Sequence, residues 1–353
     1  MTKRTILIAP LNWGLGHATR CIPIINGLLF NNFKVLLASD GAALALLRQE
    51  FPTLDFLELS SYNISYPKNG RNFKTHLIFQ LPQISRAISA EQKLIQKTVS
   101  ERPIHGIISD NRLGVRHTSI PSVYITHQLN VLTGNTTYFS SKVHQKYIRK
   151  FNECWVPDVA NSNISLTGKM GHISDEFLTL KYAGVLSRMK KNPQKETIDV
   201  LLLISGIEPQ RTLLENKLKE VFKDVEKNIL MVCGKVERQQ KWSNFHNIKT
   251  VNYMSGAQLE TTLNSSKLVI ARSGYSTIMD LAVLKKKALF IPTPGQYEQE
   301  YLANRLEKLK IAPWERQKTF SAQALQQVEK YKGFVDFTDS TIDFRSLFSL
   351  FSV

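Results

Sequence analysis

Residues 11–20 read Leu-Asn-Trp-Gly-Leu-Gly-His-Ala-Thr-Arg and follow the apolar run Thr-Ile-Leu-Ile-Ala-Pro, which is typical of a buried parallel strand. A strand, a glycine loop and an apolar helical pattern usually open a phosphate-binding fold. Here the third glycine of a dinucleotide-binding motif is missing, and His17 follows Gly16 directly. Imidazole titrates near neutral pH and often serves as a general base. The loop therefore either cradles a phosphate or presents His17, with Gly14 and Gly16 allowing a tight turn.

Two further side chains that could take up a proton follow predicted strands in the same half of the chain. Asp110 closes the run Gly-Ile-Ile-Ser-Asp, and His127 follows Ser-Val-Tyr-Ile-Thr. Each is a rival of His17 as a base, and each is alternatively an orienting group or a local cap. The remaining histidines show no metal-ligand spacing, so no metal site is expected.

Residues 272–306 carry the features of a diphosphate site. Arg272, Ser273 and Gly274 end a predicted buried strand, and a helix is expected to begin near Thr277. Backbone N–H groups at a helix start lack acceptors within the helix, and the helix dipole is positive there. The N–H groups concerned belong to Tyr275, Ser276 and Thr277. Asp280, one turn on, could accept both hydroxyls of a ribose; alternatively Thr277 and Asp280 form a capping box that only satisfies the helix end.

A second polar cluster follows the next predicted strand, residues 287–292. After a loop with proline and glycine come amides and carboxylates, namely Gln296, Glu298, Gln299 and Glu300. Such a cluster at the end of a buried strand suits the recognition of sugar hydroxyls. The alternative is a solvated helix start.

Strands and helices that alternate along the whole chain would position these groups. Predicted strands of the first half are residues 5–10, 33–39, 54–59, 106–110 and 122–126, and those of the second half are 198–206, 228–234, 248–254, 267–274 and 287–292. Alternation of this kind predicts an α/β fold with parallel, doubly wound sheets. The polar, basic stretch that begins at residue 188 is a good linker, so we expect Rossmann-like domains over residues 1–187 and 188–353, with a cleft between the carboxyl ends of their sheets.

Composition narrows the class of protein. The 353 residues are 42% apolar and 21% charged, which is typical of a folded soluble protein, and no apolar run approaches the ~20 residues of a membrane span. Three scattered cysteines and the lack of a signal-peptide pattern favour the cytoplasm. The net charge of +17 predicts an anionic partner: nucleic acid, an anionic membrane or a phosphorylated substrate. The alternative is a lysine-rich surface that only serves solubility.

Residues 67–97 combine cations with an apolar stripe. They contain six Lys or Arg and one acid, Glu91, while Leu77, Leu81, Ile84 and Ile88 recur at helical spacing. One interpretation is a helix that lies on anionic lipid. The other is a helix whose apolar face packs on the core and whose basic face is solvated.

The pattern over residues 272–306 resembles the donor-binding signature of glycosyltransferase family 28. The Arg-Ser-Gly triplet, the threonine, the acid three residues later, the proline loop and the glutamine pair match in order and spacing. In that family the helix N-terminus holds the UDP phosphates, the acid holds the ribose and the glutamine pair holds the sugar. The resemblance implies these roles for residues 275–277, for Asp280, and for Gln299 with Glu300. Asp280 is one methylene shorter than the family's glutamate and Glu300 replaces the second glutamine, which leaves the sugar open.

A weaker resemblance extends over both halves. Residues 184–188 resemble the family's interdomain segment, which implies that Arg188 reaches the diphosphate, and residues 204–206 resemble its second glycine loop, with Ser205 and Gly206 near the nucleotide. Residues 120–130 resemble the segment that lines the acceptor side, with His127 where the family has an acid.

The resemblance implies the GT-B architecture, with the donor on the second domain and the acceptor on the first. It also implies an inverting glycosyltransferase that moves a hexose or N-acetylhexosamine from a UDP-sugar to an acceptor hydroxyl, without a metal or other cofactor. In agreement, the chain has no Asp-x-Asp triplet. His17 would then meet the acceptor hydroxyl at the anomeric carbon. The acceptor is open; a lipid-linked or cell-envelope acceptor would place the protein on the inner face of the plasma membrane.

Two other functions fit part of the sequence. A non-hydrolysing UDP-sugar 2-epimerase shares the fold but normally shows a Ser-Gly-Gly motif, which this chain lacks. A non-catalytic nucleic-acid-binding protein would fit the charge, yet the chain shows neither a zinc module nor an aromatic RNA-binding signature, so no nucleic-acid partner is predicted.

Overall fold

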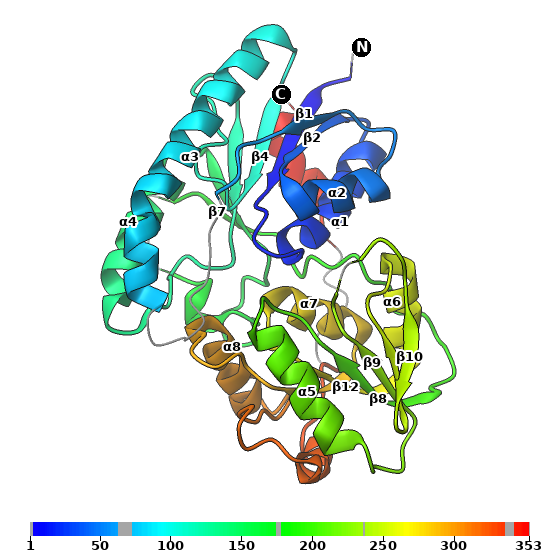
Figure 1. The fold of residues 1–353 in the computed structure, drawn as a ribbon. Coiled ribbons are helices and arrows are strands. Elements are labelled where there is room, and N and C mark those ends of the chain that lie inside the picture. The colour runs from blue at the N-terminus through cyan, green and yellow to red at the C-terminus, as the bar shows by residue number, and fades with distance from the viewer. Residues whose placement is uncertain (1–2, 63–72, 174–177, 236, 336–341, 353) are drawn as a thin grey trace. The chain divides into compact units, whose positions relative to one another are not determined.

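A computed structural model describes residues 3–62, 73–173, 178–235, 237–335 and 342–352, with the backbone only for residues 73–81. The described chain divides into two compact units. Unit 1 comprises residues 3–62, 73–173, 178–188 and 342–352, and unit 2 comprises residues 189–235 and 237–335. Each unit is built around one sheet, and helices cover both faces of that sheet (Figure 1).

The described strands of unit 1 form a parallel sheet in the order β3-β2-β1-β4-β5-β6-β7. Their bounds are β1 Thr5–Pro10, β2 Lys34–Ser39, β3 Phe56–Glu58, β4 Gly106–Asp110, β5 Ser122–Ile125, β6 Glu153–Val156 and β7 Leu180–Tyr182. The central strands are apolar and buried on both faces, as in sheets covered by helices on both sides. The chain winds outward from β1 to β3 and then crosses to β4, so the direction of winding reverses between β1 and β4.

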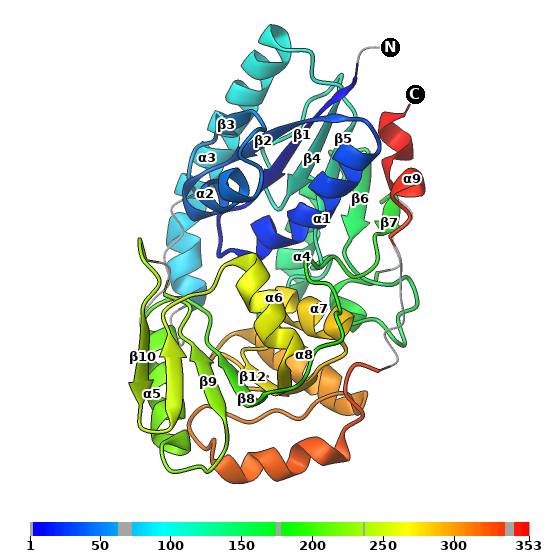
Figure 2. The same cartoon turned by 90° about the vertical axis from the view of Figure 1, so that its right-hand side faces the viewer.

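Helices on the two faces complete unit 1. They are α1 Gly16–Phe30, α2 Gly41–Glu50, α3 Phe73–Glu101, α4 Thr137–Ile148 and α9 Phe344–Leu347, with the 3₁₀ turns η2 Gly134–Thr136, η3 Gly168–Met170 and η5 Phe348–Phe351. Figures 1 and 2 show α1 and α2 on one face of the sheet and α3 on the other. Successive side chains of a strand point to opposite faces, so Leu7 and Ala9 of β1 pack in the cluster that includes Ile95 of α3.

The sheet of unit 2 has the order β10-β11-β9-β8-β12-β13, in which only the pairing of β10 with β11 is antiparallel among the described strands. The strands are β8 Ile198–Leu203, β9 Ile229–Val232, β10 Trp242–Phe245, β11 Ile248–Val251, β12 Ser266–Ala271 and β13 Lys287–Phe290. The helices are α5 Gln210–Phe222, α6 Gly256–Asn264, α7 Tyr275–Leu284 and α8 Tyr297–Lys308, with the 3₁₀ segment η4 Ala322–Lys330. Here the direction of winding reverses between β8 and β12.

The predicted α/β class with doubly wound sheets is confirmed, and every predicted strand is present. The sequence-based division at 187/188 lies one residue from the division of the structure at 188/189. The chain's last segment requires a correction, because residues 342–352 belong to unit 1 and not to the second domain. The rings of Phe348 and Phe351 lie 6.0 and 6.1 Å from the ring of Trp155 in β6, and Arg4 donates to the carbonyl of Phe351 at 2.9 Å.

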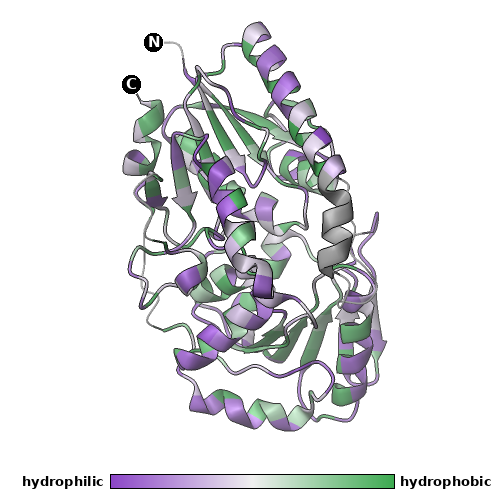
Figure 3. Ribbon diagram, turned by 90° about the vertical axis from the view of Figure 1, so that its left-hand side faces the viewer, coloured by the Kyte–Doolittle hydropathy of each residue, from purple (hydrophilic) through white to green (hydrophobic). Residues whose placement is uncertain are grey.

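The basic segment 67–97 is helical from residue 73 onward, as part of α3. Ala87, Ile88 and Ile95 are buried against the core of unit 1, whereas Arg86, Lys93 and Lys97 are exposed. Figure 3 shows the matching alternation of hydrophobic and hydrophilic residues along the described part of α3. Glu91, the one acid of the segment, is buried and accepts a hydrogen bond from Arg112 at 3.0 Å. For residues 82–97 the core-facing interpretation therefore holds. Residues 67–72 and the side chains of 73–81, Leu77 and Leu81 included, lie outside the described structure.

No helix in the parts of the chain that the structure describes is both long and apolar enough to cross a membrane.

Candidate functional site

Both units place their polar side chains where the winding of the sheet reverses. In an open α/β sheet a crevice forms at the carboxyl ends of the strands on either side of that point. In unit 1 these are the ends of β1 and β4, followed by the glycine loop and by Asp110. In unit 2 they are the ends of β8 and β12, followed by residues 204–206 and 272–274. Most of the residues singled out from the sequence thus fall at two crevices, one in each unit.

In unit 1 the structure brings His17 and Asp110 together. His17 lies in the first turn of α1, and its Nδ1 is 2.8 Å from Oδ1 of Asp110 at the end of β4. The carboxylate is fully buried, whereas the imidazole keeps 14% of its surface exposed. The glycine loop before α1 needs Gly14, whose φ of +77° is a left-handed conformation, and Gly16 is the first helical residue. His17 does not cap α1, because the N-cap is Leu15.

A buried arginine that the sequence analysis missed completes this cluster. Arg20 lies one turn after His17 on the same face of α1 and is 2% exposed. Its Nε donates to Oδ2 of Asp110 at 2.5 Å, and its Nη2 donates to Oδ1. Its Nη1 lies 2.9 Å from Nδ1 of His127, which follows β5. The guanidinium thereby links all three of the predicted candidates for the base.

The charges in this cluster set its protonation. Burial raises the pKa of a carboxyl, but the guanidinium of Arg20 and the contact with His17 outweigh it, so the pKa of Asp110 lies well below its usual range. Burial lowers the pKa of His17 below its ordinary value of 6.5, and Arg20 adds to this effect, while Asp110 opposes it. At neutral pH the pair therefore consists of a carboxylate and a neutral imidazole.

This protonation state fixes the proton of His17. An ionised carboxylate can only accept, so Nδ1 of His17 donates to Oδ1 of Asp110. Nη2 of Arg20 lies 2.9 Å from the same Nδ1, as expected for two donors that converge on one oxygen. Nε2 of His17 is left with its lone pair and can accept a proton. Asp110 is fully buried and weakly basic, so it orients His17 better than it could serve as the base.

In unit 2 the helix start has the character of an anion site. α7 begins at Tyr275, two residues before the predicted start, and its N-cap is Gly274, which has no side chain to satisfy the first N–H groups. Thr277 is the third residue of the helix, so Thr277 and Asp280 do not form a capping box. Gly274 has an ordinary φ of −71°, and an added Cβ would meet no atom within 4 Å. Neither backbone nor packing requires glycine here, and a side chain at Gly274 would have room.

Other residues of the predicted donor site support the loops around α7. Arg272 is 1% exposed and donates to the carbonyls of Ile291 and Pro292, at 3.0 and 3.1 Å, and to that of Gln210 at 3.0 Å. Ser273 donates to the carbonyl of Gln299 at 2.8 Å, and the Gln299 side-chain oxygen accepts from the N–H of Thr293 at 2.8 Å. These side chains hold the loops after β12 and β13 together.

The remaining candidates have varied settings. Ser205 is exposed and Gly206 has a φ of +110° with open space around its Cα, while Ser276 and Asp280 are half-buried. Glu300 accepts from the N–H of Gly295 at 3.4 Å. Arg188 pairs with Glu50 of unit 1 at 3.2 Å.

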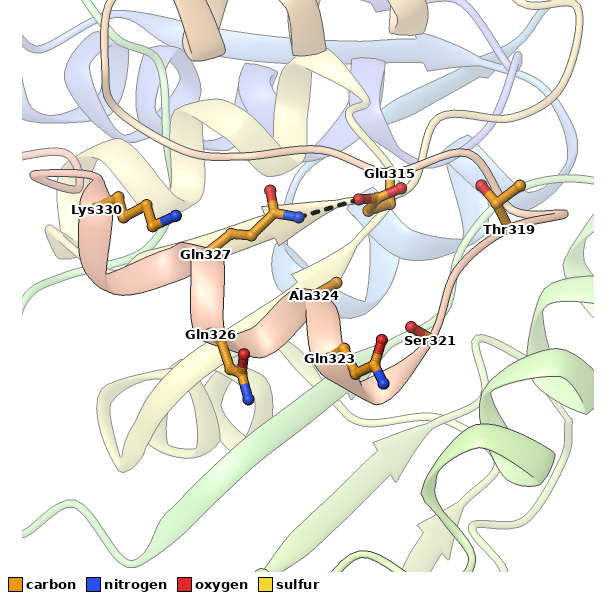
Figure 4. A pocket seen from close by; sticks show the side chains of 8 residues that line it. All are labelled: Glu315, Thr319, Ser321, Gln323, Ala324, Gln326, Gln327 and Lys330. Atoms are coloured by element: carbon orange, nitrogen blue, oxygen red, sulfur yellow. Dashed lines mark hydrogen bonds between the residues drawn. The ribbon is translucent and has the colours of Figure 1, made fainter.

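Two hollows in unit 2 contain none of these residues. One, of about 390 Å³, lies beside η4, and its lining includes Gln323, Gln327 and Glu315 (Figure 4). The other, of about 640 Å³, lies at the amino ends of β8, β12 and β13. Among the described residues no cluster of three or more His, Cys, Asp or Glu side chains could hold a metal ion.

Comparisons with known proteins relate unit 2 to a glycosyltransferase domain. Residues 200–331 match the model of the glycosyltransferase family 28 C-terminal domain. Over 171 residues the chain is 28% identical to the UDP-N-acetylglucosamine–N-acetylmuramyl-(pentapeptide) pyrophosphoryl-undecaprenol N-acetylglucosamine transferase of Clostridium kluyveri, a match that covers 48% of this chain and 46% of that protein. The chain thus spans about half the length of this curated relative.

Solved structures resemble the chain over nearly its whole length. The kitacinnamycin glycotransferase has a TM-score of 0.65 at 14% identity, with 99% of this chain and 94% of that chain covered. MurG of Acinetobacter baumannii has a TM-score of 0.56 at 13% identity, with 94% and 93% covered. At such identities the likeness concerns the fold, and the fold of two Rossmann-like units is that of the GT-B glycosyltransferases. Within unit 2, residues 200–331 match the C-terminal domain of glycosyltransferase family 28.

Proposed function

We propose that this protein is an inverting glycosyltransferase that binds a UDP-sugar on unit 2 and transfers the sugar to an acceptor hydroxyl bound by unit 1. The observation that carries the proposal is the N-terminus of α7 behind Gly274, which has no side-chain cap and has room at the Gly274 Cβ position, within the part of the chain that matches family 28. Backbone N–H groups and the helix dipole stabilise a diphosphate at such a site.

The proposed reaction is a single displacement. The acceptor oxygen attacks the anomeric carbon while the bond from that carbon to the diphosphate oxygen breaks. Nε2 of His17 takes the proton of the acceptor hydroxyl, and Asp110 stabilises the imidazolium that forms. The charge that develops on the departing UDP is stabilised by the N-terminus of α7. This accounts for the charge of the leaving group without a metal ion, and we propose that none is needed.

Donor recognition is assigned from the family's pattern. Asp280 would accept the ribose hydroxyls, and Gln299 with Glu300 would recognise the sugar, with Arg272 and Ser273 holding the loops in place. The relative from Clostridium kluyveri is named for transfer of N-acetylglucosamine, which supports a UDP-linked hexose or N-acetylhexosamine. Glu300 stands at the position of the family's second glutamine and leaves the sugar open, so the donor should be tested with several UDP-sugars.

We further propose that the acceptor is lipid-linked and is reached at an anionic membrane surface on the cytoplasmic side. The described part of α3 gives this no support, but α4 does. Its outward face carries Tyr138, Phe139 and Val143, which are 67%, 71% and 59% exposed, beside Lys142 and Lys146. The helix contains no acid. Exposed aromatic and apolar side chains among cations suit the interface of an anionic bilayer.

Calorimetry with UDP on the Gly274→Ala variant tests the donor site. The added methyl group enters space that the proposal reserves for a phosphate, so UDP affinity should fall about tenfold or more, with or without EDTA. Alanine is a poorer N-cap than glycine but restricts the unfolded chain, so the net change in stability should stay within about 1 kcal/mol.

Gly256→Ala is the matched control, because Gly256 also opens a helix of unit 2 but follows the side-chain cap Ser255. Equal UDP affinity in wild type, variant and control would contradict the proposed site. Incubation with a UDP-sugar alone distinguishes the alternative enzyme class, since an epimerase would change the sugar without an acceptor.

A further inference from the structure

We infer that Arg20 is a positioning residue that fixes the ring protons of His17 and His127 in opposite places, so that His17 accepts at Nε2 and His127 donates at Nε2. The part that concerns catalysis rests on the proposed function; the proton positions do not.

The contact between Arg20 and His127 is the first step. Nη1 of Arg20 lies 2.9 Å from Nδ1 of His127. A guanidinium carries only donors, so this contact favours a lone pair on Nδ1 of His127. Nη2 of Arg20 lies at the same distance from Nδ1 of His17, but there the carboxylate of Asp110 takes the proton of Nδ1 as acceptor. A neutral imidazole whose Nδ1 accepts holds its proton on Nε2. His127 is 6% exposed, which favours one fixed ring orientation.

His17 is in the opposite situation. Its Nδ1 lies 2.8 Å from Asp110, which accepts, so this ring holds its proton on Nδ1 and keeps the lone pair on Nε2. Arg20 prepares that arrangement because its Nε and Nη2 both bond to Asp110 and turn Oδ1 toward His17. One guanidinium therefore sets both rings.

The other groups around the cluster do not replace Arg20. Cys21 lies 3.6 Å from Oδ2 of Asp110, and Asn111 lies 3.4 Å from Oδ1. His144 acts on His127 from α4, but burial lowers the pKa of His144 to about 4, so it is neutral at pH 7. Arg20 thus lies within hydrogen-bond distance of Asp110 and of both imidazoles, and its charge lowers the pKa of His17.

Nitrogen-15 NMR of the full chain, labelled at histidine and free of substrate, tests the inference directly. The nitrogen shifts and couplings identify which ring nitrogen carries the proton, and His17→Gln and His127→Gln spectra assign the signals. At about pH 7.5 we expect the proton on Nδ1 of His17 and on Nε2 of His127. A proton on Nδ1 of His127 in the wild type overturns the inference without any Arg20 variant.

Two variants separate the charge of Arg20 from its geometry. Arg20→Lys keeps the cation but cannot bond to Asp110 and His127 in the same way, so the His127 proton should distribute over both nitrogens while the titration midpoint of His17 stays near the wild-type value. The double variant Arg20→Met with Asp110→Asn avoids a lone buried charge and should also release the His127 proton. Unchanged His127 spectra in both variants would overturn the inference.

The same variants distinguish this inference from the proposed function. If the wild-type protons are as stated but no UDP-sugar is turned over, the inference stands and the proposed function fails. If turnover is found, the pH midpoint of the acid limb of kcat/KM should follow the NMR titration midpoint of His17 in each variant. A difference of about one pH unit between the two midpoints would mean that Arg20 has no role in catalysis.

Discussion

At the scale of single residues, the buried carboxylate of Asp110 governs what His17 can do. It holds the ring through Nδ1 and is itself held by Arg20. This is the arrangement that a general base requires, because Nε2 is oriented and the imidazolium that the proposed reaction would form faces a negative charge. In the proposed enzyme the same contact would set the pH range of activity.

The proposed enzyme should remain active below the usual range of a histidine base. Because burial lowers the pKa of His17 below 6.5, the imidazole is still largely neutral at pH 6.5, and kcat/KM should fall only as the pH drops further. Asp110→Asn removes a charge that favours the imidazolium, so the acid limb should move to still lower pH, while the plateau falls about 100- to 10,000-fold. Rates measured between about pH 4.5 and 8.5 check this, and a limb above 6.5 would contradict it.

His17→Asn should separate chemistry from donor binding. Asparagine keeps a hydrogen-bond donor but cannot take a proton, so turnover should fall about 100- to 10,000-fold while UDP affinity stays within about twofold. His105→Asn, an exposed histidine of unit 1, is the control and should keep near-normal turnover. Near-normal turnover of the His17 variant would mean that His17 only orients the substrate. A loss of UDP affinity would mean that the glycine loop before α1 binds the phosphates.

Sequence predicted the residues that follow strands better than those that lie on helices. Asp110 and His127 could be named because a polar side chain at the end of a buried strand is easy to recognise, and His17 because it follows a glycine loop after such a strand. Arg20 could not, since its burial depends on a carboxylate 90 residues away. Arg272 was expected at the donor, yet its side chain points into the protein, because a strand pattern does not specify where the residue after the strand turns.

At the scale of elements, most strands that sequence identified are buried on both faces, and β3 is the exception because it is mostly exposed. The strands that it missed lack a continuous apolar run. β6 contains Glu153, which is buried because it accepts from Trp155 at 2.8 Å and pairs with Lys181 at 2.7 Å. β7 is short and half-buried, and β10 is mostly exposed. β6 pairs with β5 and β7, which lie more distant in the chain, whereas β10 pairs with the adjacent β11 as a hairpin whose exposed strand shows no apolar pattern.

Phe351→Ala should loosen unit 1 and leave unit 2 intact. The ring fills a buried position against Trp155, and a Cβ on Gly106 of β4 would lie 2.5 Å from it, so truncation should cost about 3–5 kcal/mol. Hydrogen exchange read by mass spectrometry should show faster exchange in β4 and β6 than in the wild type. Phe30→Ala, at a position that is 90% exposed, should change little. Faster exchange confined to β8 and β12 would contradict the assignment of residues 342–352 to unit 1.

At the scale of the whole molecule, the net charge of +17 attracts the protein to anionic surfaces in general. In the proposal, α4 is the part of the protein that contacts the membrane. Each cation near an anionic bilayer contributes about 1 kcal/mol, less at high salt. The charge alone does not distinguish a docking surface from a solvated one. The distinction requires variants that change the charge equally in two places.

Sedimentation with vesicles that contain anionic lipid should show binding that Lys142→Glu with Lys146→Glu weakens about tenfold or more, since two favourable charges become repulsive. Lys227→Glu with Arg238→Glu makes the same change of charge on exposed residues of unit 2 and should have a much smaller effect. Equal losses in both double variants would mean that binding follows net charge, and α4 would have no special role.

Residues 342–352 are the last described segment of the chain but belong to unit 1, and this affects the order in which the two units can finish folding. Phe348 and Phe351 close the surface around Trp155, yet the ribosome makes them only after all of unit 2 has been synthesised. The described part of unit 2 lies within one stretch of chain, residues 189–335, and can finish folding first, whereas unit 1 is begun first and finished last. During that interval apolar surface of unit 1 is uncovered on the nascent chain, and a fragment that ends at residue 188 would keep it uncovered permanently.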